Sequence, residues 1–546
     1  MNGHHLLAHT LKSLGVTHVF SLSGSPIKET LPACSHVGIR VIGVRHQQAA
    51  VSMALAHNYV SGRLTAAVIL SAGPGVTNAT TGILVAKDNC WPLLVLGGKS
   101  SSTNPARPGT FQLLDGATLF QPLSKWAAEV DSPDKIVEYV TRGYHLAMTG
   151  QPGPVYLDFP VRVLNDSAAL IEAPIPEPFF IPKPDCATLE KVAEILIQAQ
   201  RPAIIIGKGI RWSEPYKELR TIIETYQIPF ITSPMGRGLL PDDHPLCGNA
   251  ARDFLQQQAD TILIMGARLN WTFRFTTQFA KNAKLIHVDI AKEELSLDPP
   301  NSILIQGDIR QVLQELLHVL HQHGGTMTPC LTGREEWHRQ LQQVGTKYLQ
   351  QREHLANHSG SPMSPYRLMK EIREFLPRDT ICIFDGRNTM AAGQEVLPSY
   401  EPVSRFTAGS NGCMGVGVPF GVGAKLSAPH RMVVVICGDM AFGVTCMEME
   451  TAVRHNIPII VVVVNNDGPC AGQDSRTCHL PGHEPATKYL TRIPYEKIME
   501  AFGGYAESLD RPEQVQPALR RAAESGKPAC LNVYVDPQIP FHNYLG

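Results

Sequence analysis

The sequence predicts an α/β fold with three doubly wound domains, each built around a parallel sheet. Short runs of β-branched residues alternate with amphipathic segments along most of the 546 residues, which is the pattern of repeated strand–helix units. A length of about 150 residues per domain gives three or four domains. Linker-like stretches at 172–185 and 321–330 divide the chain, and we place the domains at residues 1–171, 186–320 and 364–546.

The first domain begins with an amphipathic helix at 4–15 and continues with strands that run into polar turns. Strands are expected at 17–22, 39–44, 64–70, 92–96 and within 149–163. The turns after the first three strands hold Gly24, the run 45–50 and the Gly-rich run 71–78. Open α/β sheets bind ligands at the carboxyl ends of strands, so these turns are candidate site residues. A Gly-Pro-Gly turn before a helix also serves as plain helix capping, and that alternative stays open.

The middle domain has strands at 202–206, 261–265 and 285–288, and each strand runs into a turn that contains a charged residue. These charged residues are Lys208, Arg268 and Asp289. On one edge of a Rossmann-like sheet they could hold an adenine nucleotide. The segment has no G-x-G-x-x-G, so a purely structural middle domain is an alternative of equal weight.

The third domain begins near Ser364 and contains a strand–loop–helix–strand unit at 433–468. One apolar run stops at Gly438-Asp439, and a second run ends at Asn465-Asn466. Because the connection between parallel strands is right-handed, Asp439 and Asn466 both emerge at carboxyl ends of strands. Two such side-chain oxygens, with backbone carbonyls nearby, suit Mg²⁺ held against a diphosphate. The alternative is an ordinary βαβ unit with an incidental aspartate.

Composition excludes several classes of function. Lys and Arg number 48 against 49 Asp and Glu, and this balance argues against nucleic acid or an anionic membrane as the main partner. No apolar run reaches the roughly 20 residues of a membrane span, and no secretory signal is visible at the N-terminus. The 12 cysteines are scattered without a C-x-x-C, which fits a reducing cytoplasm and no structural metal cluster.

The unit at 433–468 resembles the thiamine diphosphate motif. Asn466 lies 27 positions after Asp439 and belongs to an Asn-Asn pair that follows a run of valines. The resemblance implies that Asp439, the Asn466 side chain and the Gly468 carbonyl hold Mg²⁺. It also places three neighbours against the cofactor: Gly438, Met440 and Ala441.

The segment SAGPGVTNATTGILVAKDNCWPLLVLGG, residues 71–98, is similar to the first domain of the acetolactate synthase and pyruvate oxidase superfamily. That domain binds the aminopyrimidine ring of thiamine diphosphate, so the resemblance implies that Asn78 contacts this ring. Phe111-Gln112 falls where the superfamily has an active-site Phe-Gln. The resemblance therefore implies catalytic positions at Gln112, at Gly24 in the first turn, and at Gln47.

Within the superfamily, residues 233–271 and the run KLIHVDIAKEEL resemble 2-hydroxyacyl-CoA lyase and oxalyl-CoA decarboxylase most closely, and the resemblance covers nearly the whole chain. It implies ADP or CoA adenine contacts in the middle domain at Lys208, Arg268, Asp289 and Ile309. In the third domain it implies that Asn388 and Thr389 touch the diphosphate. Met414, which lies 25 residues before Asp439, takes the place of the bulky residue that bends the cofactor.

Two departures from the family pattern concern catalysis and substrate. The superfamily pairs a glutamate with N1′ of the pyrimidine, whereas this chain reads Arg-His-Gln-Gln-Ala-Ala and has Gln47 there. An amide can hydrogen-bond N1′ but cannot exchange a proton with it. The relatives that use CoA have an arginine where this chain has Gln394, and an alanine where it has Arg387, so CoA recognition is in doubt.

These observations favour a thiamine diphosphate-dependent lyase, carboligase or decarboxylase that makes or breaks a carbon–carbon bond next to a carbonyl. One alternative is an acetolactate-synthase-like carboligase on 2-oxo acids, and another is a cofactor-binding protein that has lost turnover. The expected substrate is a small 2-oxo acid, aldehyde or acyl-CoA. The resemblance implies a homodimer or homotetramer with the site between the first domain of one subunit and the third of another. A lid is expected between Gly468 and Tyr489.

Overall fold

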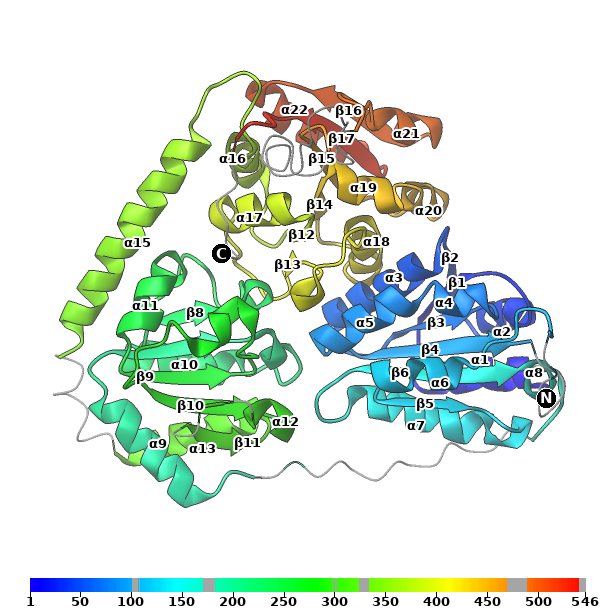
Figure 1. The fold of residues 1–546 in the computed structure, drawn as a ribbon, viewed down its shortest axis with the longest axis horizontal. Helices are drawn as coiled ribbons and strands as arrows, with labels where there is room; N and C mark the ends of the chain where they lie inside the picture. The colour runs from blue at the N-terminus through cyan, green and yellow to red at the C-terminus, as the bar shows by residue number, and fades with distance from the viewer. Residues whose placement is uncertain are drawn as a thin grey trace, which may run out of the picture. The chain divides into compact units, whose positions relative to one another are not determined.

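The computed structural model describes residues 1–100, 107, 109–169, 181, 183–296, 298–299, 302–323, 333–468 and 489–539. As far as they are described, residues 1–169, 360–392 and 406–539 form one compact unit, and residues 181–359 and 393–405 form another. Three parallel sheets confirm the predicted class of three doubly wound α/β domains (Figure 1). Most of the expected linkers at 172–185 and 321–330, and the expected lid at 469–488, lie outside the described residues.

The first sheet is built from the N-terminal residues and has the strand order β2-β1-β3-β4-β6-β5. Its strands are β1 (His18–Leu22), β2 (Arg40–Gly43), β3 (Ala66–Leu70), β4 (Leu93–Lys99), β5 (Trp126–Glu129) and β6 (Pro154–Pro160). Its helices are α1 (Gly3–Ser13), α2 (Thr30–His36), α3 (Gln47–Ser61), α4 (Pro74–Thr77), α5 (Thr80–Asn89), α6 (Gly116–Phe120), α7 (Ile136–Met148) and α8 (Val161–Asn165). β3 is buried at every position, as expected of a central strand with both faces covered.

The C-terminal sheet repeats this topology, with the order β13-β12-β14-β15-β17-β16. Its strands are β12 (Ile381–Asp385), β13 (Arg405–Phe406), β14 (Val433–Gly438), β15 (Ile460–Asn465), β16 (Tyr505–Leu509) and β17 (Ala529–Tyr534). Its helices are α16 (Pro365–Phe375), α17 (Arg387–Val396), α18 (Gly417–Ser427), α19 (Asp439–Thr445), α20 (Glu448–Arg454), α21 (Glu496–Ala501) and α22 (Pro512–Glu524). Because the two sheets share one strand order, α3 corresponds to α18 and α5 corresponds to α20.

The two sheets of this unit pack together through α3 and α18. The helices touch so closely that a side chain at Gly423 would meet the Met53 carbonyl oxygen at 2.0 Å. Aromatic rings from both sides fill the same contact, with Trp91 5.7 Å from Phe420 between ring centroids. Contacts of this kind hold the N- and C-terminal sheets as one unit within the chain.

The middle sheet has five parallel strands in the order β11-β10-β9-β7-β8. Its strands are β7 (Pro202–Ile206), β8 (Phe230–Thr232), β9 (Thr261–Met265), β10 (Lys284–Asp289) and β11 (Ile303–Gln306). Its helices are α9 (Cys186–Gln198), α10 (Tyr216–Tyr226), α11 (Arg252–Gln258), α12 (Lys292–Leu295), α13 (Ile309–Gln322) and α15 (Glu335–Ala356). The short strands β5, β8 and β11, which have three or four residues each, were not predicted from the sequence, and neither were β13, β16 and β17 of the C-terminal sheet.

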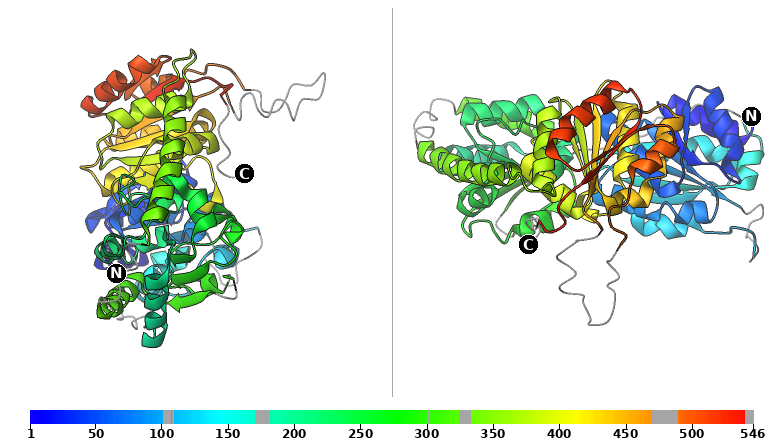
Figure 2. Two further views of the ribbon diagram at one scale, coloured as in Figure 1. Left: turned by 90° about the vertical axis from the view of Figure 1, so that its left-hand side faces the viewer. Right: turned by 90° about the horizontal axis from the view of Figure 1, so that it is seen from above.

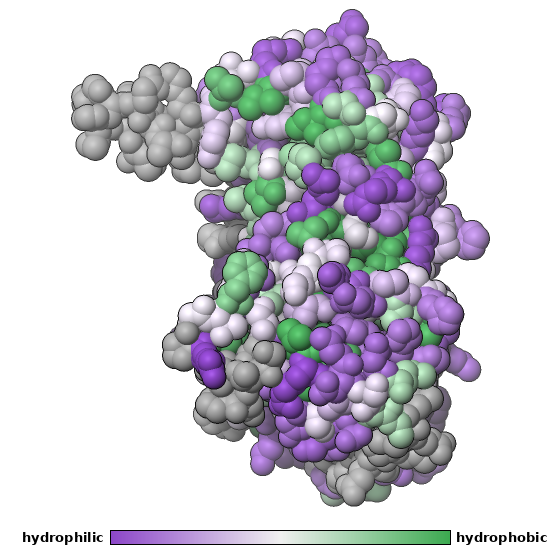
Figure 3. All heavy atoms as spheres, turned by 90° about the vertical axis from the view of Figure 1, so that its right-hand side faces the viewer, coloured by the Kyte–Doolittle hydropathy of each residue, from purple (hydrophilic) through white to green (hydrophobic). Residues whose placement is uncertain are grey.

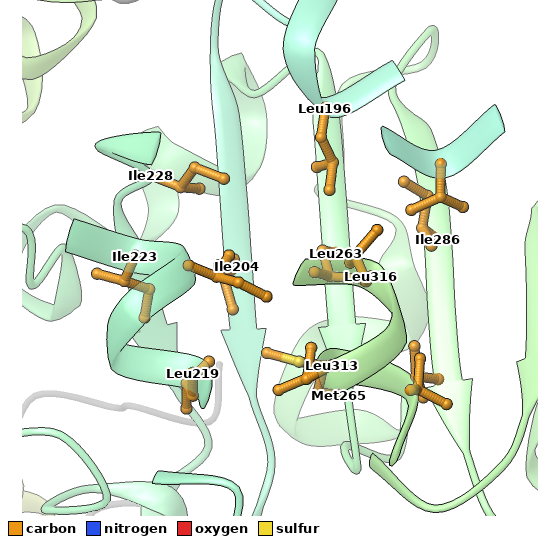
Figure 4. Close-up of a cluster of buried hydrophobic side chains, with 14 of the residues drawn as sticks. Leu196, Ile204, Leu219, Ile223, Ile228, Leu263, Met265, Ile286, Leu313 and Leu316 are labelled. Atoms are coloured by element: carbon orange, nitrogen blue, oxygen red, sulfur yellow. The ribbon is translucent and has the colours of Figure 1, made fainter. Parts of the chain in front are cut away.

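Alternate residues of the middle strands face opposite layers of helices, as the period of a strand requires. Ile204 and Leu263 pack against α9, α10 and α13 on one face (Figure 4). Ile205 and Ile262 belong to a second cluster, which Leu255 of α11 and Trp337 of α15 complete. Figure 2 shows from two further directions that helices flank the sheets on both faces. The middle domain is therefore doubly wound, and α15 contributes Trp337 to one of its two layers of helices.

Candidate functional site

The first and last sheets each have a switch point, which is the place where connections from two neighbouring central strands leave in opposite directions. It lies between β1 and β3 in one sheet and between β12 and β14 in the other. Ligands of open α/β sheets bind outside the carboxyl ends of strands at such points. Gly24 and Ser71 follow the first pair of strands, while Gly386 and Asp439 follow the second pair.

Asp439 begins α19 and has a fixed carboxylate at the end of β14. Its Oδ1 accepts from the Met440 amide at 2.8 Å, and its Oδ2 accepts from the Gly468 amide at 2.7 Å. The residue is 4% exposed, and burial raises the pKa of this carboxyl. A carboxylate in this position lacks the solvation that water would give, and a nearby cation would offset that cost.

Asn466 and Gly468 follow β15, the strand next to β14. Asn466 is nearly buried, and its side chain makes no hydrogen bond with any residue that the structure describes. Gly468 has a φ of +112°, a value that few residues other than glycine adopt. The structure thus brings Asp439 and Gly468 into direct contact and places Asn466 one strand away.

The turn after β12 lies against the turn after β14. Gly386 has a φ of +93°, and a side chain on Gly438 would lie 3.4 Å from the Thr389 hydroxyl. Thr389 is buried and Asn388 is half-buried, both in the first turn of α17. Glycine backbone beside a hydroxyl, at strand ends and helix starts, is the kind of surface that binds anionic groups in proteins. Met440 and Ala441 continue the first turn of α19 beside it.

The loop that carries Met414 is tied to the same edge by Asp385. The Gly417 amide donates to Asp385 Oδ2 at 2.7 Å, while Oδ1 has no hydrogen-bond partner among the described residues. Burial raises the pKa of Asp385 to about 6, although backbone amides oppose the shift. Met414 itself is 44% exposed. Asp385 was not singled out in the sequence because a strand-end acid gives no sign of which loop it holds.

The N-terminal switch point gathers Gln47, Asn78, Gly24 and Gln112. Gln47 is the first residue of α3 and is 6% exposed; its Oε1 accepts from Asn78 Nδ2 at 3.1 Å. A side chain on Gly24 would meet Ser71 Cβ at 2.7 Å, so β1 and β3 approach closely here. A side chain on Gly73 would likewise meet Gln112 Cβ at 2.8 Å. The groups on this edge are neutral amides and hydroxyls.

The N- and C-terminal edges meet beside Gln47 and Met414. Gln48 Nε2 donates to Cys413 Sγ at 3.6 Å, and these residues are the immediate neighbours of Gln47 and Met414. The amides of Arg45 and His46 both donate to Glu448 Oε1 at 3.0 Å. Sequence reasoning missed Glu448, which is 403 residues away along the chain and carries no local motif.

The four middle-domain candidates lie at carboxyl ends of adjacent strands. Lys208 follows β7, Arg268 follows β9, Asp289 ends β10 and Ile309 follows β11. Arg268 Nε donates to Glu294 Oε1 at 2.6 Å, so its charge already has a partner. Burial raises the pKa of Asp289, which accepts from the Ala291 amide at 2.9 Å. The structure brings the four to one edge of the sheet.

The described part of the chain has neither a cluster of acidic, His or Cys metal ligands nor a membrane-spanning helix. No group of three or more His, Cys, Asp or Glu side chains there could hold a metal ion, so a cation at Asp439 would depend on neutral oxygens as well. No helix among the same residues is long and apolar enough to cross a membrane.

Three family models match the chain. They are described as the N-terminal TPP binding domain, the central domain and the C-terminal TPP binding domain of thiamine pyrophosphate enzymes, and they match residues 1–119, 189–316 and 386–533.

Among relatives, 2-hydroxyacyl-CoA lyase 1 of Mus musculus is 35% identical, with 98% of this chain and 94% of the relative covered. Oxalyl-CoA decarboxylase of Escherichia coli strain K12 is 31% identical, with 98% and 95% covered. A probable acetolactate synthase of Mycobacterium bovis is 30% identical, with 99% and 97% covered.

Proposed function

This chain belongs to the thiamine pyrophosphate enzyme family, as its sequence motifs predicted, and we propose that it uses thiamine diphosphate to make or break a carbon–carbon bond next to a carbonyl. Its relatives include enzymes named as a lyase, a decarboxylase and a synthase. The observation that carries the proposal is the fixed Asp439 carboxylate at the C-terminal switch point, with Asn466 on the neighbouring strand and Gly468 bonded to it.

The residues at this switch point fit a magnesium ion and a diphosphate. Asp439 supplies one buried carboxylate and Asn466 an amide without a described partner, while Gly468 adds a backbone carbonyl. Mg²⁺ is often bound by one or two carboxylates together with substrate phosphates, which suits a site with a single acid. Asn388, Thr389 and the backbone at Gly438 would hold the diphosphate, since the Thr389 hydroxyl lies beside a glycine that has no side chain to cover its backbone.

When bound, thiamine diphosphate supplies a nucleophilic carbon that adds to a carbonyl and stabilises the charge left when a neighbouring bond breaks. The chain has three tasks around it. Met414 would lie against the cofactor, and Gln47 and Asn78 would hold the pyrimidine ring by hydrogen bonds. Gly24 and Gln112 would lie beside the reacting atoms.

Gln47 cannot transfer a proton as a carboxylic acid at this position would. Its amide is held by Asn78 and has no ionisable proton, so it can orient a ring nitrogen but cannot deliver a proton to it. Loss of a positioned acid–base group typically lowers the rate by about 10²- to 10⁴-fold. This observation favours a second candidate function, in which the protein binds the cofactor with little turnover.

The substrate proposed is a small 2-oxo acid, an aldehyde or an acyl-CoA. Gln394 argues against recognition of CoA, because its side chain has no guanidinium to bind a CoA phosphate. Its backbone carbonyl accepts from Arg237. ADP or the adenine of CoA is proposed for the middle domain at Lys208, Arg268, Asp289 and Ile309, because they share one sheet edge.

We also propose a homodimer or a dimer of dimers, with the site completed across subunits. Large apolar side chains are exposed near the Met414 loop: Met414 itself at 44%, Val444 at 53% and Met447 at 44%. Figure 3 shows hydrophobic patches among hydrophilic side chains on one face of the molecule. Apolar surface of this kind beside a site supports burial by a second copy.

The function is tested by incubating the purified protein with thiamine diphosphate, Mg²⁺ and a panel of 2-oxo acids, aldehydes and acyl-CoAs, with products identified by mass spectrometry. We expect a product that differs from its substrate by a carbon–carbon bond made or broken beside a carbonyl. Cofactor binding without any such product across the panel would favour the second candidate function.

A further inference from the structure

The matching topology of the N- and C-terminal sheets leads to a pair of reciprocal contacts. In each of the two domains, one loop precedes the helix that packs against the other domain. Residues 44–46 lead into α3, and residues 407–416 lead into α18. The first loop leads directly to Gln47, and the second contains Met414. Each loop is held by polar side chains of the corresponding helix, α20 or α5, from the opposite sheet.

Glu448 at the start of α20 holds the loop before α3. Its Oε1 accepts from the amides of Arg45 and His46 at 3.0 Å each, and its Oε2 accepts from the Thr451 hydroxyl at 2.7 Å. The residue is 1% exposed, so water does not replace these bonds. Hydrogen bonds that involve a charged group are stronger than neutral ones, and a buried amide without an acceptor is costly.

Asp88 and Asn89 at the end of α5 hold the loop before α18. Asn89 Nδ2 donates to the Ala408 carbonyl at 3.0 Å, and Asn411 Nδ2 donates to Asp88 Oδ2 at 2.9 Å. Asn89 is 1% exposed, and a side chain on Gly409 would meet its Oδ1 at 1.8 Å, so the loop lies directly on it. The two contacts are alike in position although their residues differ.

We propose that Glu448 is a positioning residue for Gln47 and that Asp88 and Asn89 do the same for Met414, so that each domain fixes the ligand-facing loop of the other. This proposal rests on the proposed function, in which Gln47 faces the pyrimidine ring and Met414 bends the cofactor. Gln47 follows His46 directly and begins α3, so the two amides held by Glu448 set where that helix starts.

The test compares Glu448→Gln with Glu450→Gln. Both changes remove one carboxylate from α20. Among the described residues, however, Glu450 hydrogen-bonds the side chain of Arg454, at 2.9 Å, and lies 3.9 Å from that of Arg45. Amide hydrogen exchange is followed by NMR in protein without cofactor. Glu448→Gln should raise exchange at Arg45 and His46 by about tenfold, because both bonds lose the charge of their shared acceptor and the Arg45 amide also loses its 3.3 Å bond to Oε2. Glu450→Gln should leave exchange at both amides unchanged.

A second pair of probes separates positioning from general stability. Binding of thiamine diphosphate with Mg²⁺ requires both loops, whereas inorganic diphosphate with Mg²⁺ requires only the C-terminal edge. We expect Glu448→Gln to weaken thiamine diphosphate by about tenfold and to leave inorganic diphosphate unchanged. Asn89→Ala should raise exchange at residues 408–415 and leave the amides of Arg45 and His46 as they were.

Thr451→Val provides a milder variant that keeps the carboxylate and removes one of its donors, and it should give a smaller rise in exchange at the same two amides. Equal exchange in Glu448→Gln and Glu450→Gln would overturn the proposal. Equal weakening of both diphosphate ligands would also overturn it, because that is the result of a merely structural role. Failure of the unaltered protein to bind thiamine diphosphate would instead count against the proposed function. The exchange experiment, which uses no cofactor, would still report whether Glu448 holds the loop.

Discussion

Gln47→Glu restores a carboxylic acid at the position where the family resemblance places one. Gln47 is 6% exposed and accepts from Asn78 Nδ2 at 3.1 Å, and a glutamate of the same length can accept that bond. Burial raises the pKa of a carboxyl, so the new acid holds its proton closer to neutral pH than an exposed glutamate does. A positioned acid–base group contributes about 10²- to 10⁴-fold, and we expect exchange of the cofactor C2 proton to accelerate at least tenfold.

The exchange is measured by quench flow in deuterium oxide, followed by proton NMR of the acid-released cofactor. Gln48→Glu is the matched control, because it adds the same charge one residue away, where the side chain contacts Cys413 Sγ. Turnover need not rise, since a later protonation can limit it. Equal exchange rates in Gln47→Glu and the parent would refute the reasoning that Gln47 faces N1′ and limits the rate.

Three further predictions use other parts of the chain. Burial raises the pKa of Asp158 to about 6, so the folded state binds this proton more tightly than the unfolded state does. The contribution of Asp158 to the free energy of unfolding should therefore be greatest below about pH 4 and should fall by about 3 kcal/mol as the pH rises through 6. Chemical denaturation at pH 4 and pH 7 should show a smaller difference in Asp158→Asn than in the parent. ADP or CoA at millimolar concentration should give heat by calorimetry, and Arg268→Ala should abolish it; no heat with the parent would leave the middle domain purely structural. Sedimentation with the cofactor bound should give a dimer or tetramer at micromolar concentration, and a monomer would contradict a site completed across subunits.

The strands and the C-terminal edge could be predicted because their signals are local. The run that ends at Asp439 is β-branched and stops at Gly438, so periodicity and composition locate both the strand and its carboxyl end. The short strands β5, β8 and β11 have too few residues for a period to show. They form because neighbouring strands supply partners for their backbone, which no local pattern records.

The contacts around the candidate site could not be predicted for a different reason. In the sequence, Glu448 is one of two acids on a short helix and nothing distinguishes it from Glu450. It is buried because the packing of α3 on α18 brings the Arg45 amide to it. Asp385 likewise accepts from the Gly417 amide across 31 intervening residues, which include α17 and β13. Such contacts are set by tertiary packing, between two sheets for Glu448 and within one sheet and its helices for Asp385.

The central claim is that Asp439 holds the magnesium ion and diphosphate of thiamine diphosphate, and the most direct measurement is cofactor retention after desalting. The parent protein, loaded with thiamine diphosphate and Mg²⁺, should retain about one of each per chain, measured by fluorescence of the oxidised cofactor and by metal analysis. Asp439→Ala should retain neither, because the change removes the carboxylate proposed to hold the cation and the acceptor of the Gly468 amide. Asp467→Asn, which changes a neighbouring acid bonded to the Arg492 amide, should retain both. Retention by Asp439→Ala equal to that of the parent would contradict the account.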